Sequence, residues 1–184
     1  MANILLEGFP GVGKTTLVKK VIDNLKVNGI DCDGFYTEEV RSGRTRVGFD
    51  IVTLNGQRTS LARKSINENL TKNLPQVGQY SVLLNEFECL ALPVLESDKS
   101  VLIIDEIGKM ELHSRKFEEA VRKAILKKNI VLATVPVKCN LHLIKQLKGN
   151  SRNHLIMVNE ANRNSLTKEI SDLIVKEYNK ITTK

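Results

Sequence analysis

The stretch "GFPGVGKTTL", residues 8–17, constrains the fold of this chain more than any other segment. It follows the short apolar run "NILLEG" and precedes an amphipathic stretch over residues 14–28. It fits the pattern G-x-x-x-x-G-K-[ST] without a mismatch, with Gly8, Gly13, Lys14 and Thr15 at the fixed positions. A strand, a glycine-rich turn and a helix in this order are typical of the phosphate-binding loop of α/β proteins. The motif therefore predicts a sheet with this loop at the carboxyl end of a buried strand.

The chemistry of phosphate binding explains this spacing. Glycines at positions 8, 11 and 13 let the backbone wrap closely, so that consecutive N–H groups point inward at phosphate oxygens. The helix that begins near Lys14 adds its positive end to the same place. In this motif Lys14 reaches the β- and γ-phosphates and the Thr15 hydroxyl can bind Mg²⁺. The loop thus predicts a nucleoside triphosphate as ligand and Mg²⁺ as its cofactor.

Two adjacent acids, Asp105 and Glu106, end another apolar run, "VLII". At the carboxyl end of a neighbouring parallel strand, Asp105 can hold Mg²⁺, directly or through water. Glu106 is one acid more than the metal needs, and a carboxylate there can orient and deprotonate a water that attacks the γ-phosphate. We expect hydrolysis rather than transfer to another nucleotide. The alternative for Glu106 is an ion pair with a surface lysine.

Thr134 and several arginines are weaker candidates for the same site. Thr134 ends the apolar run "IVLAT", where P-loop ATPases with such a glutamate often place a residue that contacts the γ-phosphate or the water. An ordinary strand-end threonine explains it equally well. An arginine would stabilise charge on the transferring phosphoryl group. The candidates are Arg41, Arg44, Arg46, Arg115 and Arg163, and the sequence leaves the choice among them open.

The rest of the chain alternates between apolar and amphipathic segments. We expect strands at 3–8, 101–104, 130–135 and 154–159, and a hairpin over 32–54. We expect helices at 14–28, 85–98, 112–128, 141–148 and 162–180, and irregular structure over 55–80. Apolar strands without polar alternation, separated by helices, indicate a mostly parallel sheet covered on both faces. Residues 1–184 show no break in composition that would mark a second domain.

The net charge of +7 lies mainly in the second half of the chain. The densest basic stretch, within 115–128, has its basic residues mostly on one helix face, at Arg115, Lys116, Arg122, Lys123, Lys127 and Lys128. Such a face suits nucleic acid. A solvated helix face is the favoured interpretation, because the chain has no Trp, few aromatic residues and no RNA-binding signature.

Two further features bear on the compartment. No apolar run approaches the ~20 residues of a membrane span, so we expect no membrane association. The cysteines, Cys32, Cys89 and Cys139, are odd in number and widely spaced. They predict neither a disulfide framework nor a zinc site, and they fit a reducing cytoplasm.

Six phrases in this order resemble the THEP-type nucleoside-triphosphatases, a small P-loop family of thermophiles and animals. They are "GFPGVGKTTL", "DGFYTEEVR", "VGFDIVTL", "VGQY", "FECLALPVL" and "IIDEIGKMEL". The resemblance spans roughly residues 3–167, and "GFYTEEVR" and "IDEIGKMEL" are far more specific than a P-loop. It implies an α/β P-loop NTPase fold with a RecA-like core and a β-hairpin inserted near residues 35–54.

The resemblance also implies an activity, namely Mg²⁺-dependent hydrolysis of ATP, GTP, CTP, UTP and TTP to diphosphate and phosphate, with diphosphates cleaved less well. It carries roles to two segments. Phosphate contacts are expected from Gly8, Phe9, Pro10, Gly11, Val12, Gly13, Lys14, Thr15 and Thr16. The second nucleotide-binding segment is expected at Val101, Leu102, Ile103, Ile104, Asp105, Glu106, Ile107 and Gly108. The absence of an N-K-x-D motif agrees with loose base selectivity. Glu7, directly before the loop, departs from the family pattern and would weaken phosphate binding if it pointed at the loop.

Two other functions use the same loop. A nucleotide or small-molecule kinase would use the arginine-bearing hairpin as a lid. An RNA-associated nucleotide-binding switch would use the basic helix at 115–128. Glu106 argues against the kinase, because a group that activates water favours hydrolysis. The oligomeric state has no signature in the sequence.

Overall fold

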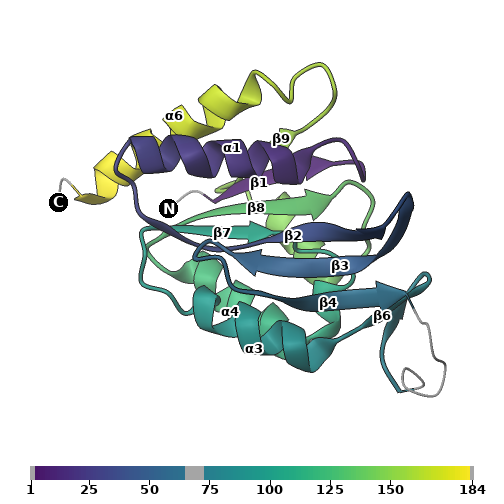
Figure 1. The fold of residues 1–184 in the computed structure, drawn as a ribbon. Helices are drawn as coiled ribbons and strands as arrows, with labels where there is room; N and C mark the ends of the chain where they lie inside the picture. Colours follow the sequence, from purple (N-terminus) through teal and green to yellow (C-terminus); the bar gives the residue numbers. More distant parts are fainter. Residues whose placement is uncertain (1–2, 65–72, 183–184) are drawn as a thin grey trace.

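An open sheet between two layers of helices forms the body of the protein in the computed structural model, which describes residues 3–64 and 73–182 (Figure 1). The strands in these ranges are β1 (Ile4–Gly8), β2 (Cys32–Ser42), β3 (Thr45–Thr53), β4 (Arg58–Lys64), β5 (Gln76–Val77), β6 (Tyr80–Val82), β7 (Val101–Asp105), β8 (Ile130–Pro136) and β9 (His154–Met157). The helices are α1 (Lys14–Val27), α3 (Leu84–Leu95), α4 (Arg115–Leu126), α5 (His142–Gly149), α6 (Leu166–Thr182) and the short 3₁₀ helix η1 (Glu111–His113).

The strand order is β5-β6-β4-β3-β2-β7-β8-β1-β9. From β2 to β9 all neighbours are parallel, whereas from β5 to β2 they are antiparallel. Strand β2 belongs to both halves: residues 32–36 pair with β7, and residues 35–42 pair with β3. The predicted parallel core and hairpin are therefore confirmed, and the hairpin extends the same sheet.

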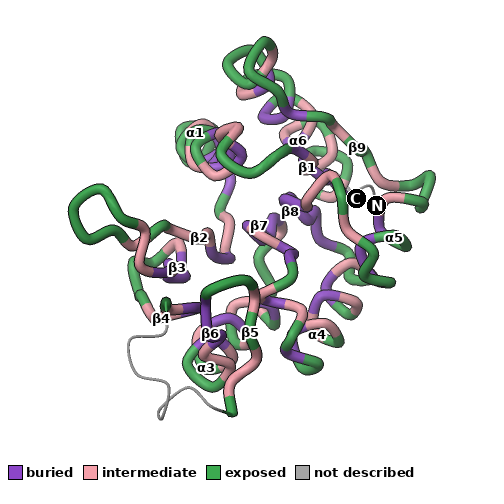
Figure 2. The backbone as a smooth tube through the Cα atoms, turned by 90° about the vertical axis from the view of Figure 1, so that its right-hand side faces the viewer, coloured by how far each residue is buried: buried purple, intermediate pink, exposed green. Residues whose placement is uncertain are grey.

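Both faces of β1, β7 and β8 are buried, which explains why these strands show no polar alternation. Val101 and Ile103 of β7 pack on the side of α1 and α6, while Leu102 and Ile104 pack on the side of α3, α4 and α5. Figure 2, an end view, shows β7 and β8 as buried strands between these two layers. The prediction of helices on both faces is confirmed.

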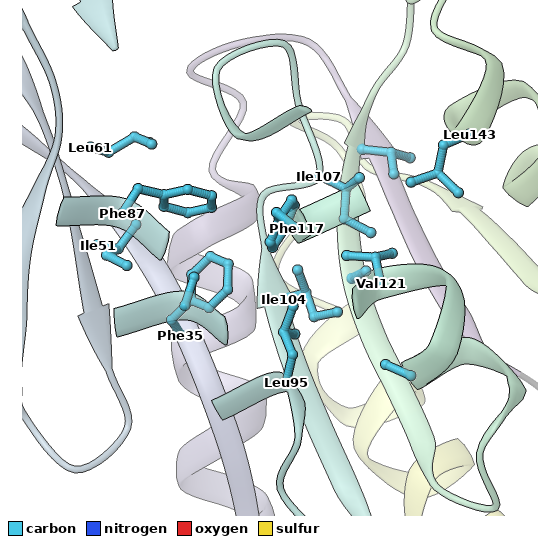
Figure 3. Packing of buried hydrophobic residues seen from close by; sticks show 14 of the residues in the cluster. Phe35, Ile51, Leu61, Phe87, Leu95, Ile104, Ile107, Phe117, Val121 and Leu143 are labelled. Atoms are coloured by element: carbon cyan, nitrogen blue, oxygen red, sulfur yellow. The ribbon is translucent and has the colours of Figure 1, made fainter. Parts of the chain in front are cut away.

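Three phenylalanines join α3 and α4 to the sheet. Phe35 of β2, Phe87 of α3 and Phe117 of α4 are fully buried, with ring centroids 5.0–6.1 Å apart (Figure 3). Edge-on and tilted rings at these distances are favourable beyond their buried area. They hold α3 and α4 against β2 and β7, and β7 ends at Asp105.

The expectation of irregular structure over 55–80 is wrong for most of the residues that the structure describes. Residues 58–64 form β4, and β5 and β6 follow at 76–77 and 80–82. Strand β4 is polar because its charges are paired across strands: Arg58 and Arg63 both contact Asp50 of β3. Only Leu61 and Ala62 are buried. Residues 65–72 lie outside the described residues.

Two helices begin later than expected, at 115 instead of 112 and at 166 instead of 162. At the first, the Ser114 hydroxyl accepts a hydrogen bond from Phe117 N at 3.0 Å and caps α4, while residues 111–113 form η1. A side-chain cap of this kind sets where a helix starts. The turn before α4 thereby becomes part of the loop that follows β7. Among residues 3–64 and 73–182, no helix combines the length and apolarity needed to cross a membrane.

Candidate functional site

The glycine-rich loop joins β1 to α1 as predicted, and a glycine with positive φ stands directly before Lys14. Gly13 has φ 103°, in the left-handed region that favours glycine. Gly8 is needed for a different reason, because a Cβ there would lie 2.9 Å from Val12 Cγ1 and 3.0 Å from Val158 O. The loop thus requires glycine at both ends, and it places the N-terminus of α1 at the carboxyl end of β1.

Lys14 connects the loop to the end of β7. Its side chain is 8% exposed, its Nζ donates to Gly8 O at 3.0 Å, and it lies 3.6 Å from Glu106 Oε2. An ammonium group carries three donors, so further bonds to phosphate oxygens are compatible with this position. Lys14 thus lies beside Glu106, the acid that directly follows β7.

Asp105 is buried at the end of β7. Its Oδ1 accepts a hydrogen bond from the Thr134 hydroxyl at 2.5 Å. Burial raises the pKa of Asp105, whereas the hydroxyls of Thr134 and Thr15 and the charge of Lys14 lower it. Its Oδ2 is buried and has no hydrogen-bond partner among the described residues. A buried carboxylate oxygen without a partner requires an explanation.

Mg²⁺ provides one. The ion is usually bound by one or two carboxylates together with substrate phosphates. Asp105 offers the unpaired oxygen. The Thr15 hydroxyl lowers the pKa of the same carboxyl group, which indicates that the two groups lie close together. The donors present therefore fit the predicted cation.

Glu106 directly follows Asp105 and, unlike it, lines the cleft described below. Its side chain is 31% exposed. Burial raises the pKa of Glu106, Lys14 lowers it and the neighbouring Asp105 raises it. A carboxylate with a raised pKa that is still open to water has the properties of a general base.

A cleft of about 710 Å³ runs from the glycine-rich loop past the ends of β8 and β7 to the hairpin. It gathers residues from the loop and α1, from the segment after β7, from the antiparallel half of the sheet, and from the segment after β8. Its lining is Gly8, Pro10, Gly11, Gly13, Lys14, Thr15, Thr16, Thr37, Glu38, Glu39, Arg46, Phe49, Leu61, Val77, Glu106, Lys109, Met110, Glu111, Pro136 and Lys138.

Several residues expected to bind nucleotide are not in this lining. The side chains of residues 101–104 and of Ile107 are in the hydrophobic core. Phe9, by contrast, is 58% exposed. Val12 and Gly108 are also absent from the lining. Residues 101–104 and Ile107 therefore act as a scaffold. Of residues 101–108, Glu106 is the one in the cleft lining, and Asp105 lies buried next to it in the chain.

Thr134 is fully buried and outside the cleft lining. Its hydroxyl binds Asp105, and its backbone oxygen accepts a hydrogen bond from Ile107 N at 2.9 Å. In this arrangement Thr134 holds the residues on both sides of Glu106.

The structure separates the candidate arginines by position. Arg46 lines the cleft, with Nε 2.9 Å from Tyr80 Oη and Nη1 2.8 Å from Glu39 Oε1. Arg163 lies against the loop, donating to Val12 O at 3.1 Å. The other three, Arg41, Arg44 and Arg115, are exposed and outside the lining.

Glu7 points away from the phosphate loop's donors. Its Oε2 lies 2.6 Å from Lys148 Nζ, which also donates to Pro136 O and Val137 O. The charge of Glu7 is therefore compensated by α5, and the expected weakening of phosphate binding has no basis in this geometry.

Five charged residues of the lining were not expected from the sequence: Glu38, Glu39, Lys109, Glu111 and Lys138. Glu111 is buried, and burial together with the charge of Glu106 raises its pKa to about 8. The phrase "IDEIGKMEL" contains Glu111, but the sequence pattern shows no reason for it to return to the site. That return depends on the turn that leads into η1.

The basic helix α4 has partners for part of its charge. Lys116 pairs with Glu88 at 2.8 Å, and Arg122 pairs with Glu118 at 2.7 Å. These exposed pairs contribute little to stability. They agree with the interpretation of this face as a solvated surface.

A family model described as "NTPase" matches residues 3–171. The human "Cancer-related nucleoside-triphosphatase" is 44% identical over 178 residues, which cover 91% of this chain and 94% of that protein. "Nucleoside-triphosphatase THEP1" of Thermotoga maritima is 42% identical over 175 residues, covering 94% and 95%.

Two solved structures have the same fold. The solution structure of a human cancer-related nucleoside triphosphatase has a TM-score of 0.82 at 42% identity, covering 95% of this chain and 97% of that one. The crystal structure of THEP1 from the hyperthermophile Aquifex aeolicus has a TM-score of 0.81 at 39% identity, covering 94% and 98%. The similarity thus extends over nearly the whole of each chain.

Proposed function

The chain belongs to the NTPase family and is a nucleoside-triphosphatase, and from this premise we propose that it is a Mg²⁺-dependent hydrolase of ATP, GTP, CTP, UTP and TTP with loose base selectivity. Diphosphates would be cleaved less well. The observation that carries this proposal is the position of Lys14 Nζ between the glycine-rich loop and Glu106, 3.0 Å from Gly8 O and 3.6 Å from Glu106 Oε2.

In the proposed reaction a water attacks the γ-phosphorus, the bond to the β,γ-bridging oxygen breaks, and diphosphate and phosphate leave. Glu106 orients the water and takes its proton. Lys14 and the backbone N–H groups of the loop stabilise the charge on the leaving diphosphate. Thr15 and Asp105 would hold Mg²⁺, which when bound neutralises phosphate charge. Among the arginines, Arg46 is best placed to approach the phosphoryl group from the hairpin.

Asp105→Asn should weaken hydrolysis through the metal. The amide keeps the shape of the side chain but removes the negative charge, so a higher Mg²⁺ concentration should restore part of the turnover. A titration of activity against Mg²⁺ for wild type and variant measures this shift. Turnover that stays low at every Mg²⁺ concentration, or a wild-type titration curve, would count against the metal assignment.

Turnover should vary little with the base and should stop when divalent cations are chelated. The glycine-rich loop and Lys14 in the cleft lining suit phosphate, and the sequence contains no base-reading motif. A panel of the five triphosphates, each with and without chelator, is the measurement. A hundredfold preference for one base, which corresponds to ~2.7 kcal/mol, would contradict loose selectivity.

The same assay on thin layers separates hydrolysis from the rival functions. Free labelled phosphate without an added acceptor is the expected result. Label that appears on a second nucleotide would indicate a kinase, and a salt-dependent shift of RNA would indicate a nucleic-acid-associated switch.

We also propose one cytoplasmic domain over residues 1–184, which the single sheet and the three free cysteines of the described residues support.

A further inference from the structure

Glu111 is a buried carboxyl group beside the site that the proposed reaction does not use. It is the first residue of η1, it is 4% exposed, and it lines the cleft together with Glu106. Buried acids are rare unless they are paired or bound. Its position therefore calls for a role.

Its nearest contacts are within the loop that carries Glu106. Gly108 N donates to Glu111 Oε2 at 3.1 Å. A Cβ on Gly108 would lie 2.8 Å from Glu106 Oε1 and 2.9 Å from Glu111 Oε2. The two carboxyl groups thus flank the same α-carbon, and only a glycine leaves room for both.

The backbone around them is fixed by further hydrogen bonds. Ile107 N donates to Thr134 O at 2.9 Å, and Leu112 N donates to Gly108 O at 3.1 Å. With these bonds, the Glu111 side chain closes a small ring from residue 108 to residue 111. Glu106 lies two residues before that ring, and Ile107 between them is held by Thr134 O, so the direction of Glu106 depends on the ring's shape.

We propose that Glu111 is a positioning residue for hydrolysis: its side chain anchors the Gly108 amide and keeps the Glu106 carboxylate turned to the cleft. This inference rests on the proposed role of Glu106 as the base. Glu111 itself touches neither the water nor the nucleotide in this account, and it acts through the loop.

The charges around Glu111 explain why the neutral form matters. Burial and the charge of Glu106 raise the pKa of Glu111 to about 8, with Asp105 adding to the rise. The other charged groups that share its cleft are Lys14 of α1, Glu38 and Glu39 of β2, Arg46 of β3, Lys109 of its own loop and Lys138 after β8. On α4, Arg115 and Lys116 are exposed, and Lys116 pairs with Glu88.

The sign of the pH effect follows from this raised pKa. Below about 8 the carboxyl is mostly protonated, and above it a second negative charge forms beside Glu106. Two carboxylates beside the same α-carbon repel each other. Loss of the proton should therefore displace Glu106 and lower turnover on the alkaline side.

The test uses three variants of the full chain: Glu111→Ala, Glu111→Gln and, as control, Glu119→Gln at an exposed position on α4. Glu111→Ala should lower kcat by roughly 10- to 100-fold, the usual cost of a misplaced catalytic group, with KM little changed. Glu111→Gln should stay close to wild type at neutral pH, because its amide oxygen still accepts from Gly108 and it carries no charge. The control should match wild type.

A pH profile of kcat separates positioning from a purely structural role. Wild type should lose turnover as the pH rises through about 8, and Glu111→Gln should not show that decline. If Glu111→Ala proves unfolded by circular dichroism, the comparison of wild type with Glu111→Gln still decides. The proposal is overturned by a folded Glu111→Ala with wild-type kcat, by a Glu111→Gln as slow as the alanine variant, or by the same alkaline decline in both.

A double variant keeps this outcome apart from failure of the proposed function. If Glu111 acts through Glu106, adding Glu111→Ala to Glu106→Gln should slow the reaction little further, because coupled residues are not additive. A slow Glu111→Ala beside a fully active Glu106→Gln would reject Glu106 as the base. A full additional loss in the double variant would reject action through Glu106.

Discussion

Glu106→Gln should slow nucleotide hydrolysis by roughly 10²–10⁴-fold, the usual contribution of a general base, while nucleotide affinity stays near that of wild type. The amide keeps the shape of the side chain but cannot take a proton from water. Lys14 would keep its bond to Gly8 O, so the loop should remain in place. Single-turnover kinetics with a binding measurement on a non-hydrolysable triphosphate test both parts.

A metal titration makes this prediction more specific. The defect of Glu106→Gln lies in the chemical step, so extra Mg²⁺ should not restore turnover, in contrast to Asp105→Asn. Glu119→Gln is the matched control, since it makes the same change on an exposed surface. Near-normal turnover in Glu106→Gln, or its rescue by Mg²⁺, would remove Glu106 as the base and favour the kinase.

Lys14→Ala should abolish hydrolysis and weaken triphosphate binding. Its ammonium group is buried where the loop, the end of β7 and the expected γ-phosphate meet, and charged hydrogen bonds to phosphate are among the strongest in proteins. The substitution also leaves Glu106 without its nearby cation, so the base and the phosphates would repel each other more strongly.

Calorimetric titration of the same triphosphate analogue into Lys14→Ala measures the loss. Lys20→Ala removes an exposed lysine from the same helix and should bind and turn over like wild type. Wild-type turnover in Lys14→Ala would show that residues 8–15 are not the phosphate site.

Local patterns in the sequence are sufficient to predict the parallel core. The run Val101–Ile104 is apolar at every position because it is buried on both faces, and the loop motif specifies its own strand and helix. Strand β4 was missed because its stability depends on partners elsewhere. Its arginines look like loop residues until Asp50 of β3 is placed beside them.

In the candidate site, too, residues that belong to local motifs are predictable, whereas residues that depend on distant partners are not. Lys14, Asp105 and Glu106 follow from motifs at strand ends, and the structure brings them together. The choice among Arg41, Arg44 and Arg46 could not be made, because it depends on Tyr80, which is 34 residues away from Arg46 in the chain. Glu111 was missed for a related reason: its return to the site requires the turn from Gly108 into η1.

Hydrolysis in water labelled with a heavy oxygen isotope tests the central claim, attack of water on the γ-phosphorus, most directly. Mass spectrometry of the products should find one labelled oxygen in each phosphate released and none in the diphosphate, and Glu106→Gln should slow the appearance of that label in parallel with turnover. Label in the nucleoside diphosphate, or turnover that produces phosphorylated acceptor without labelled phosphate, would contradict it.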